Sequence, residues 1–236
     1  MCFMVKCPYV PPHEFDLDFP HLMLRARAIE HKKGETSFTD KQLAKTDRNG
    51  KLATKVSGLA NWATKESNGM TRGAMEKTLG IDKRAHLPRY ESKPLTKTPA
   101  DAMPAVNVDA PSFGRKAAIY ATCYGNFNDA TPGKAALDVL AHNGVQCRIE
   151  HPLCCGMPLL ENGDLDGVAK SAEAVAAHFE PLIDRGYDIV ALTPSCALML
   201  KFEWPLILPD NPTVQKLSLI HISEPTRPFT LSRMPA

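Results

Sequence analysis

The segment "KAAIYATC" (residues 116–123) is a short apolar run of strand-forming residues that ends in a cysteine. Two similar runs follow it, "VQCRIEHP" (145–152) and "YDIVALTPS" (187–195). Helix-like sequence separates the three runs, "GKAALDVLAHNG" (133–144) and "LDGVAKSAEAVAAHFEPLIDRG" (165–186). Strands that alternate with helices predict an α/β fold, with a parallel sheet covered on both faces and functional groups at the carboxyl ends of the strands.

Four cysteines follow the three predicted strands. Cys123 lies at the end of the first strand, Cys154 and Cys155 just after the second, and Cys196 just after the third. The two adjacent cysteines do not readily bridge to each other, because the ring that they would close is strained. Since the carboxyl ends of parallel strands meet at one edge of a sheet, we expect all four thiols to converge there.

Four convergent thiols indicate a metal site. Thiolates are soft ligands that suit iron–sulfur clusters or zinc, and four of them complete either kind of site. Gly156, directly after the cysteine pair, has no side chain and lets backbone N–H groups approach sulfur. The alternative for any single buried cysteine is a small apolar core residue, and we expect this for Cys147, inside the second strand. For the four strand-end cysteines together, metal binding is favoured.

The residues before the first strand are predicted to be largely helical. A short helix is expected within residues 19–34, ending near the glycine. Residues 35–87 contain charged, helix-like pieces whose apolar face includes Leu52 and Leu59, and we expect Trp62 to pack beside that face. The stretch that follows is rich in proline and small residues and is predicted to be a linker.

The C-terminal segment "LSLIHISEPTR" (217–227) does not resemble natural protein sequence. It looks like the translated end of a transposase adapter from a sequencing library, and "SRMP" (232–235) matches the next constant part of such an adapter. The alternative is a natural disordered tail. We therefore expect residues 217–236 to be an artefact and a C-terminal part to be missing. Met1, beside a cysteine motif, is likewise expected to be an internal methionine of a longer protein.

Charge and hydropathy exclude some classes of protein. The 28 Lys and Arg residues nearly balance the 26 Asp and Glu residues, which argues against a nucleic-acid partner. Residues 29–97 are basic and residues 116–216 acidic, an asymmetry that indicates either a docking surface or solvated helices. No run approaches the roughly twenty apolar residues of a membrane span. Seven cysteines without a secretory signal predict a reducing, cytoplasmic setting.

Four stretches together give the chain a specific resemblance to a known family. They are "CFMVKCPYVPPHEFDLDFPHLMLRA" (2–26), "YATCYGNFND" (120–129), "CCGMPLLENGDLD" (154–166) and "TPSCALMLKFEWPLIL" (193–208). The chain resembles the iron–sulfur oxidoreductases with cysteine-rich CCG domains, which are related to the B subunit of heterodisulfide reductase. Within this family it is most similar to the type found as the third subunit of anaerobic glycerol-3-phosphate dehydrogenase. Members of this type have a ferredoxin domain with two 4Fe-4S clusters, followed by two CCG domains.

The resemblance implies roles for six cysteines. Cys2 and Cys7 match the last two cysteines of the second ferredoxin motif, one for each cluster. The cysteines that match the first CCG domain are Cys123, Cys154, Cys155 and Cys196. The full CCG motif ends in a C-x-x-C pair, whereas Met199 occupies the partner position here, so the type of cluster at this site stays open. Because the first ferredoxin cysteines are missing, this chain alone is not expected to assemble either N-terminal cluster.

These observations predict a chain of five segments. The predicted fold class is α/β, with the end of a ferredoxin-like domain and a helical segment before a parallel-sheet CCG domain. The segments are a C-terminal remnant of a two-cluster ferredoxin domain (1–34), a basic helical segment (35–87), a linker (88–115), the first cysteine-rich CCG domain (116–216) and the adapter-derived tail (217–236).

The function implied by the resemblance is that of an electron-transfer subunit of an oxidoreductase complex. Its clusters would accept electrons from a flavoprotein dehydrogenase partner and pass them towards a quinone or a thiol/disulfide acceptor, a task that needs no general acid or base. A membrane or quinone-reducing partner is compatible with the basic segment, which would hold the protein peripherally on the inner face of the membrane. A soluble helical spacer is the simpler expectation for that segment.

Three alternatives stay open at this stage. The four thiolates would also hold zinc in a structural or thiol-binding module without redox activity. A nucleotide-binding α/β enzyme is disfavoured, since "CYGNFNDATPG" (123–133) contains no G-x-G-x-x-G motif. His151, just before the cysteine pair, is either a ligand or proton relay or, as we expect for a lone histidine, a structural residue at the surface or a hinge.

Overall fold

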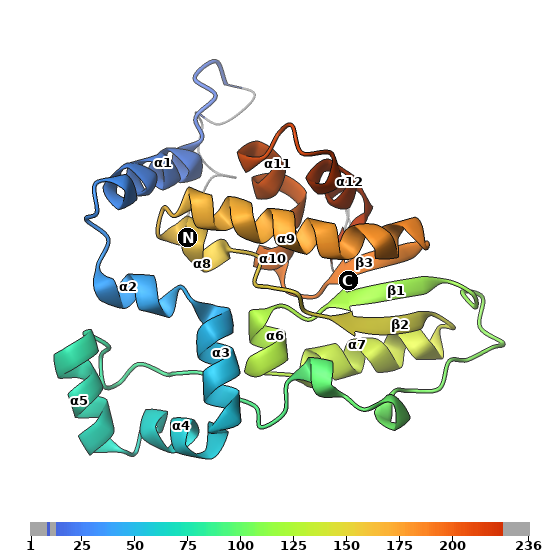
Figure 1. The fold of residues 1–236 in the computed structure, drawn as a ribbon, viewed down its shortest axis with the longest axis horizontal. Coiled ribbons are helices and arrows are strands. Elements are labelled where there is room, and N and C mark those ends of the chain that lie inside the picture. The colour runs from blue at the N-terminus through green and yellow to red at the C-terminus, as the bar shows by residue number, and fades with distance from the viewer. Residues whose placement is uncertain (1–8, 10–12, 224–236) are drawn as a thin grey trace, which may run out of the picture.

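A computed structural model describes Tyr9 and residues 13–223 of the chain. Cys2 and Cys7 lie outside the described residues, so the remnant of a ferredoxin domain stays a prediction. The described part consists of an α/β domain with a series of helices, α1 to α5, along one side of it (Figure 1).

The sheet has the strand order β2-β1-β3-β4, and every pair of neighbours is parallel. The central strand β1 is the most deeply buried, with Ala118, Ile119 and Tyr120 fully shielded from solvent. The parallel sheet and the α/β fold class predicted from the sequence are therefore confirmed. The strands are β1 (Lys116–Tyr120), β2 (Gln146–Glu150), β3 (Tyr187–Ala191) and the short β4 (His221–Ser223).

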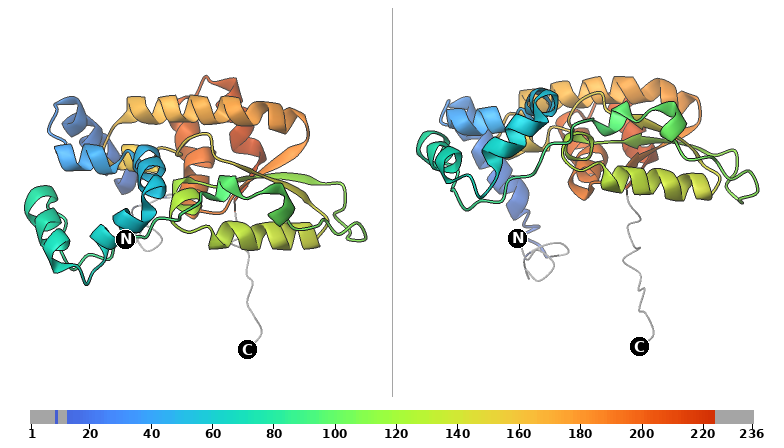
Figure 2. Two further views of the ribbon diagram at one scale, coloured as in Figure 1. Left: turned by 60° about the horizontal axis from the view of Figure 1, so that its bottom comes forward. Right: turned by 90° about the horizontal axis from the view of Figure 1, so that it is seen from below.

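Helices cover both faces of the sheet. The long helix α9 (Leu165–Asp184) lies on one face and α7 (Thr131–His142) on the other (Figure 2). Helix α9 buries residues at helical spacing, among them Val168, Val175 and Phe179, and this apolar stripe forms much of the core. Short helices follow the strands at their carboxyl ends: α6 (Cys123–Phe127), α8 (Met157–Glu161) and α10 (Pro194–Leu198).

Strand β2 forms an edge of the sheet, and Cys147 on this strand is therefore partly exposed. The expectation that Cys147 is a core residue is only half met, because its side chain is partly exposed on the edge strand. Its sulfur lies 3.6 Å from the carbonyl oxygen of Val145, and burial raises the pKa of its thiol to about 11. Cys147 therefore stands apart from the other described cysteines.

The helices on the side of the domain do not pack as the sequence predicts. The expected apolar face is absent from this described segment, since Leu52, Leu59 and Trp62 are each more than half exposed. The helix breaks at Val56, which separates α3 from α4, so the periodic residues do not line one continuous stripe. The helices are α1 (Phe19–Lys32), α2 (Phe38–Leu43), α3 (Thr46–Lys55), α4 (Ser57–Thr64) and α5 (Gly69–Leu79).

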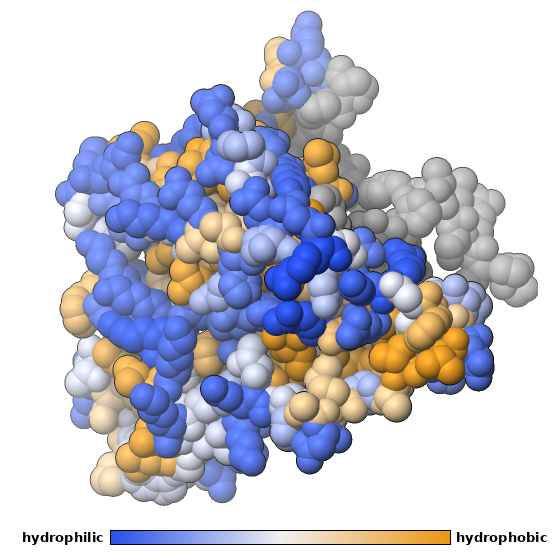
Figure 3. Space-filling model, turned by 45° about the vertical axis from the view of Figure 1, so that its right-hand side comes forward, coloured by the Kyte–Doolittle hydropathy of each residue, from blue (hydrophilic) through white to orange (hydrophobic). Residues whose placement is uncertain are grey.

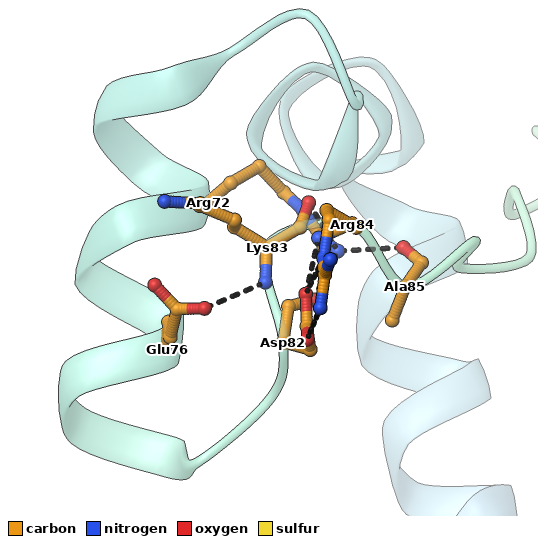
Figure 4. Close-up of polar contacts among 6 residues, drawn as sticks. All are labelled: Arg72, Glu76, Asp82, Lys83, Arg84 and Ala85. Carbon is orange, nitrogen blue, oxygen red and sulfur yellow. Dashed lines mark hydrogen bonds and ion pairs between the residues drawn. The ribbon is translucent and has the colours of Figure 1, made fainter.

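A buried arginine fixes the chain after α5. Arg72 is 1% exposed and donates hydrogen bonds to the backbone carbonyls of Asp82, Lys83 and Ala85, as Figure 4 shows. Gly80 ends the helix with a left-handed φ of 71°. The arginine side chain therefore takes the place of further secondary structure in satisfying these carbonyl groups.

The segment expected to be a linker is packed against the domain. It contains two turns of 3-10 helix, η2 (Leu95–Lys97) and η3 (Ala100–Ala102). Leu95 is 2% exposed and forms a small core cluster with Ala121 and Ala130. The backbone N–H of Thr96 donates to the side-chain oxygen of Asn126 at 3.0 Å. The segment thus has fixed contacts, while the domain boundaries themselves stay predictions.

The C-terminal part of the described chain returns to the sheet. It passes through the π-helical turn η4 (Met199–Glu203), α11 (Trp204–Ile207) and α12 (Pro212–Ile220) before β4. Leu217 is fully buried, and α12 packs against α9. The burial of Leu217 does not test the adapter-like origin of residues 217–236, which stays a prediction.

The surface is mostly hydrophilic on the face drawn in Figure 3, with hydrophobic residues in separate patches. Scattered exposed apolar residues are ordinary for a folded protein. Among the residues that the structure describes, no helix has both the length and the apolar character needed to cross a membrane.

Candidate metal centre

The structure brings together the four cysteines that follow the strands. The sulfur atoms of Cys123 and Cys154 lie 3.6 Å apart, and those of Cys155 and Cys196 lie 3.3 Å apart. The thiols of Cys154 and Cys155 also interact, so the four sulfurs form a connected row. The last three of these cysteines are buried and Cys123 is partly buried. The parallel strands produce this arrangement, because each delivers its cysteine to the same edge of the sheet.

The donor set suits a metal that prefers sulfur. Four thiols in a largely buried row match the soft ligands of iron–sulfur clusters and zinc. In the described part of the chain, no three or more His, Cys, Asp or Glu side chains are arranged as ligands of one metal ion. The residues therefore fit a thiolate-bound group in their chemistry.

The thiols differ strongly in acidity. Hydrogen bonds with the thiols of Cys123 and Cys155 lower the pKa of Cys154 far below its usual value, and the Thr46 hydroxyl and the Gly156 backbone N–H add to this effect. The pKa of Cys123 is raised, first by the hydrogen bond between its thiol and that of Cys154 and then by burial. The neighbours of Cys154 thus favour its thiolate form.

Gly156, directly after the cysteine pair, has a left-handed backbone conformation that favours glycine. Its φ of 85° is left-handed, and a Cβ atom there would lie 3.4 Å from the Cα of Val168. Its N–H approaches the sulfur of Cys154, as expected for a residue without a side chain. The role of Gly156 in binding a cofactor stays a prediction.

Thr122, directly before Cys123, holds a strained conformation. Its φ of 56° is rare for a β-branched residue. The side-chain oxygen accepts a hydrogen bond from the N–H of Gly125 and lies 3.3 Å from the hydroxyl oxygen of Thr193. Strain of this kind persists only where the surroundings enforce it. Here it turns the chain sharply out of β1, so that Cys123 begins α6.

A network from α3 supports the cysteine loop, and the sequence did not reveal it. Asp47 accepts a hydrogen bond from the backbone N–H of Cys154 at 2.5 Å and another from His151 Nε2 at 2.8 Å. The only signal in the sequence is an acidic residue in the first turn of a helix, which is common in proteins without such a role. The basic helical segment is therefore part of the centre and not only a spacer.

His151 lies in the interior, contrary to the expected surface or hinge position. Its side chain is 2% exposed, because α3 covers it and Asp47 pairs with it. Its ring stacks on Tyr120 at 6.1 Å and meets Phe127 edge-on at 5.4 Å. The described contacts make His151 a structural link between the strand ends and α3.

Two aromatic side chains fix the backbone around the cysteine pair. Trp204 is fully buried and its indole N–H donates to the carbonyl oxygen of Cys155 at 3.0 Å. The hydroxyl of Tyr120 donates to the carbonyl oxygen of Leu153 at 2.6 Å. Met199, at the position where the family motif has a further cysteine, is fully buried in the same core cluster. Its thioether supplies no thiolate.

Comparison with known proteins gives both a family and relatives. Residues 117–201 match the family of cysteine-rich CCG domains. The C subunit of anaerobic glycerol-3-phosphate dehydrogenase from Escherichia coli (strain K12) is 27% identical over 195 residues, which cover 82% of this chain and 48% of that protein. Lactate utilization protein A of Bacillus thuringiensis (strain Al Hakam) is 30% identical over 118 residues, 49% of this chain and 46% of that protein.

The chain spans about half the length of the curated relatives that it matches. No solved structure matches it. The matched region contains the three main strands and all four cysteines of the row. The resemblance found in the sequence is therefore confirmed: residues 117–201 match the family of cysteine-rich CCG domains, and the chain is similar to the C subunit of anaerobic glycerol-3-phosphate dehydrogenase.

Proposed function

We propose that this chain is an iron–sulfur electron-transfer subunit of an oxidoreductase complex, with the CCG centre held by Cys123, Cys154, Cys155 and Cys196. The observation that carries the proposal is the connected row of these four sulfurs, with contacts of 3.6 and 3.3 Å. Scattered core cysteines would not meet in this way. Similarity to a protein named as a dehydrogenase subunit supports the assignment.

Four thiols in contact fit either an iron–sulfur cluster or a single zinc ion, and similarity to a dehydrogenase subunit favours the cluster. Zinc in a structural site needs four ligands around one point, at the corners of a tetrahedron. An iron–sulfur cluster contains several iron atoms, so its cysteine ligands bind at separate points. With Zn–S bonds of about 2.3 Å, the sulfurs of a zinc tetrahedron lie about 3.8 Å apart. The contacts of 3.6 and 3.3 Å do not exclude that geometry, so the cluster assignment rests on the similarity to a dehydrogenase subunit and not on this spacing.

The residues of the chain serve to bind the cluster and to adjust its electronic properties. A bound cluster would supply one-electron storage, and no general acid or base is required for that role. Trp204 and Met199 bury the inner side of the row and exclude water from it. The N–H of Gly156 is positioned to stabilise negative charge on the sulfur of Cys154.

The wider role is that of a link between partners in the cytoplasm. A flavoprotein dehydrogenase partner would donate electrons, and a quinone or a thiol/disulfide pair would accept them. The basic segment (35–87) would allow peripheral contact with the inner face of the membrane. Cys2 and Cys7 would bind 4Fe-4S clusters only in an intact ferredoxin domain. Neutralising the basic residues without any change in fractionation would count against membrane contact.

Anaerobic reconstitution of the chain with iron and sulfide tests the proposal. We expect a coloured protein with iron and acid-labile sulfide bound and an EPR signal in one redox state. A Cys2→Ser/Cys7→Ser double variant should keep this signal, Cys196→Ser should lose it, and Cys147→Ser is the matched control that should keep it. A colourless, EPR-silent protein that retains stoichiometric zinc would overturn the proposal in favour of the zinc module.

A further inference from the structure

The geometry points to Thr46 as a positioning residue of the centre: we propose that its hydroxyl donates a hydrogen bond to the sulfur of Cys154 in the cluster-bound protein and so raises the reduction potential. This inference rests on the proposed function. It places a determinant of the centre's electronic properties on α3, outside the cysteine-rich domain at residues 117–201.

The first observation is an unpaired hydroxyl at the edge of the centre. The side-chain oxygen of Thr46 is buried and has no hydrogen-bond partner of ordinary geometry. The next residue, Asp47, holds the backbone N–H of Cys154. Helix α3 also packs against α6, which begins at Cys123. The hydroxyl is thus buried between the loop of Cys154 and the start of α6, at the edge of the row of sulfurs.

The other hydroxyls and the carboxylate near the centre are already engaged, whereas Nδ1 of His151 is buried without a partner. The hydroxyls of Thr122 and Thr193 lie 3.3 Å from each other, and that of Thr122 also accepts from Gly125. Asp47 uses both carboxylate oxygens. Among these three threonine hydroxyls beside the centre, that of Thr46 is therefore the one left to serve a sulfur acceptor.

The expected effect follows from electrostatics. A neutral thiol is a weak acceptor, whereas a metal-bound thiolate is a stronger one. One-electron reduction adds a negative charge to the cluster and its ligands, so a donated hydrogen bond stabilises the reduced state more than the oxidised state. Removing the donor should lower the potential.

The chain offers a matched control on the same helix. Thr54 is also buried, and its hydroxyl also lacks a hydrogen-bond partner. It lies eight residues further along α3, about 12 Å from Thr46 along the helix axis. Replacing either threonine with valine exchanges a hydroxyl for a methyl group of similar size, so only the position relative to the sulfurs differs.

The test is a redox titration of the reconstituted full chain, followed by EPR. We expect Thr46→Val to decrease the equilibrium constant for one-electron reduction about tenfold, a shift of about 59 mV to lower potential. Thr46→Ser, which keeps the hydroxyl, and Thr54→Val should retain the original potential. If Thr46→Val and Thr46→Ala fail to hold a cluster while Thr46→Ser holds one, the hydroxyl is required and the inference stands.

Three results would overturn the inference. The first is a potential for Thr46→Val equal to that of the unaltered chain, and the second is an equal shift in Thr54→Val. The third is loss of the cluster in Thr46→Ser together with the valine variant, which would assign the effect to packing. If the unaltered chain binds no cluster, the proposed function itself is refuted. This result is seen before any variant is made, so it cannot be confused with a failure of the inference about Thr46.

Discussion

The carboxylate of Asp47 accepts a hydrogen bond from the backbone N–H of Cys154, a residue 107 positions later in the chain. The same carboxylate accepts a hydrogen bond from His151, which leads into the cysteine loop. A single side chain on α3 therefore holds the loop at two points. The predicted centre consequently depends on a helix that precedes the cysteine-rich domain.

Replacement of Asp47 tests this dependence. Asp47→Ala leaves a buried N–H and the buried imidazole of His151 without their acceptor, so the free energy of unfolding should fall by about 2 to 4 kcal/mol. Urea denaturation measures this change, and the reaction rate of a thiol reagent reports on the opening of the loop. Asp138→Ala, at an exposed position on α7, is the control and should change neither quantity much. Equal stability of both variants would show that the loop does not need α3.

Gly156 should tolerate a side chain poorly, because its backbone is left-handed and its N–H lies beside the sulfur of Cys154. The left-handed backbone at φ 85° costs an alanine about 1 to 2 kcal/mol. Gly186, with φ 79° and no atom within 4 Å of its Cβ position, is the matched control. Both alanine variants should lose similar stability in thermal unfolding, but only Gly156→Ala should disturb cluster binding. Normal cluster content in Gly156→Ala would contradict the assigned role.

The contact of α1 with the domain should depend on pH through His21. Burial lowers the pKa of this histidine, but hydrogen bonds with Asp18 and Glu203 outweigh that effect, so the pKa is raised above its ordinary 6.5. Protonated His21 therefore contributes stability that is complete below pH 6.5 and is lost as the pH rises through the folded-state pKa. The contribution is small, since the side chain is 37% exposed.

Thermal unfolding at a series of pH values measures the contribution of His21. His21→Gln should flatten the decline in melting temperature across neutral pH. The same decline in both proteins would show that another group causes it.

Arg72 should stabilise the segment after α5 through its backbone contacts. Arg72→Leu removes the donor for the carbonyls of Asp82, Lys83 and Ala85, so this region should lose about 2 to 4 kcal/mol of local stability. Limited proteolysis should then cut near these residues, while the sheet stays intact. Arg84→Leu, which removes an exposed arginine that pairs with Asp82, should leave the cleavage pattern unchanged. Equal protection of both variants would refute the role of Arg72.

Much of the fold was predictable, because local sequence patterns determine it. The three apolar runs became β1, β2 and β3, and the helical pattern between them became α7 and α9. The apolar face predicted around Leu52 and Leu59 was wrong, since a helical period indicates a buried face only if the helix is continuous and has a partner. Nothing in the sequence indicated that Leu95 would anchor the expected linker in a small core cluster.

The sequence by itself determined the parallel sheet and the convergence of Cys123, Cys154, Cys155 and Cys196, because strand direction places the residue after each strand at a common edge. The tertiary structure alone decided that Thr46 and Asp47 lie at that edge and that His151 is buried beside them. No local pattern encodes a contact across about one hundred residues. It arises when α3 packs against α6, and the burial of polar groups there then requires that they pair with one another or with sulfur.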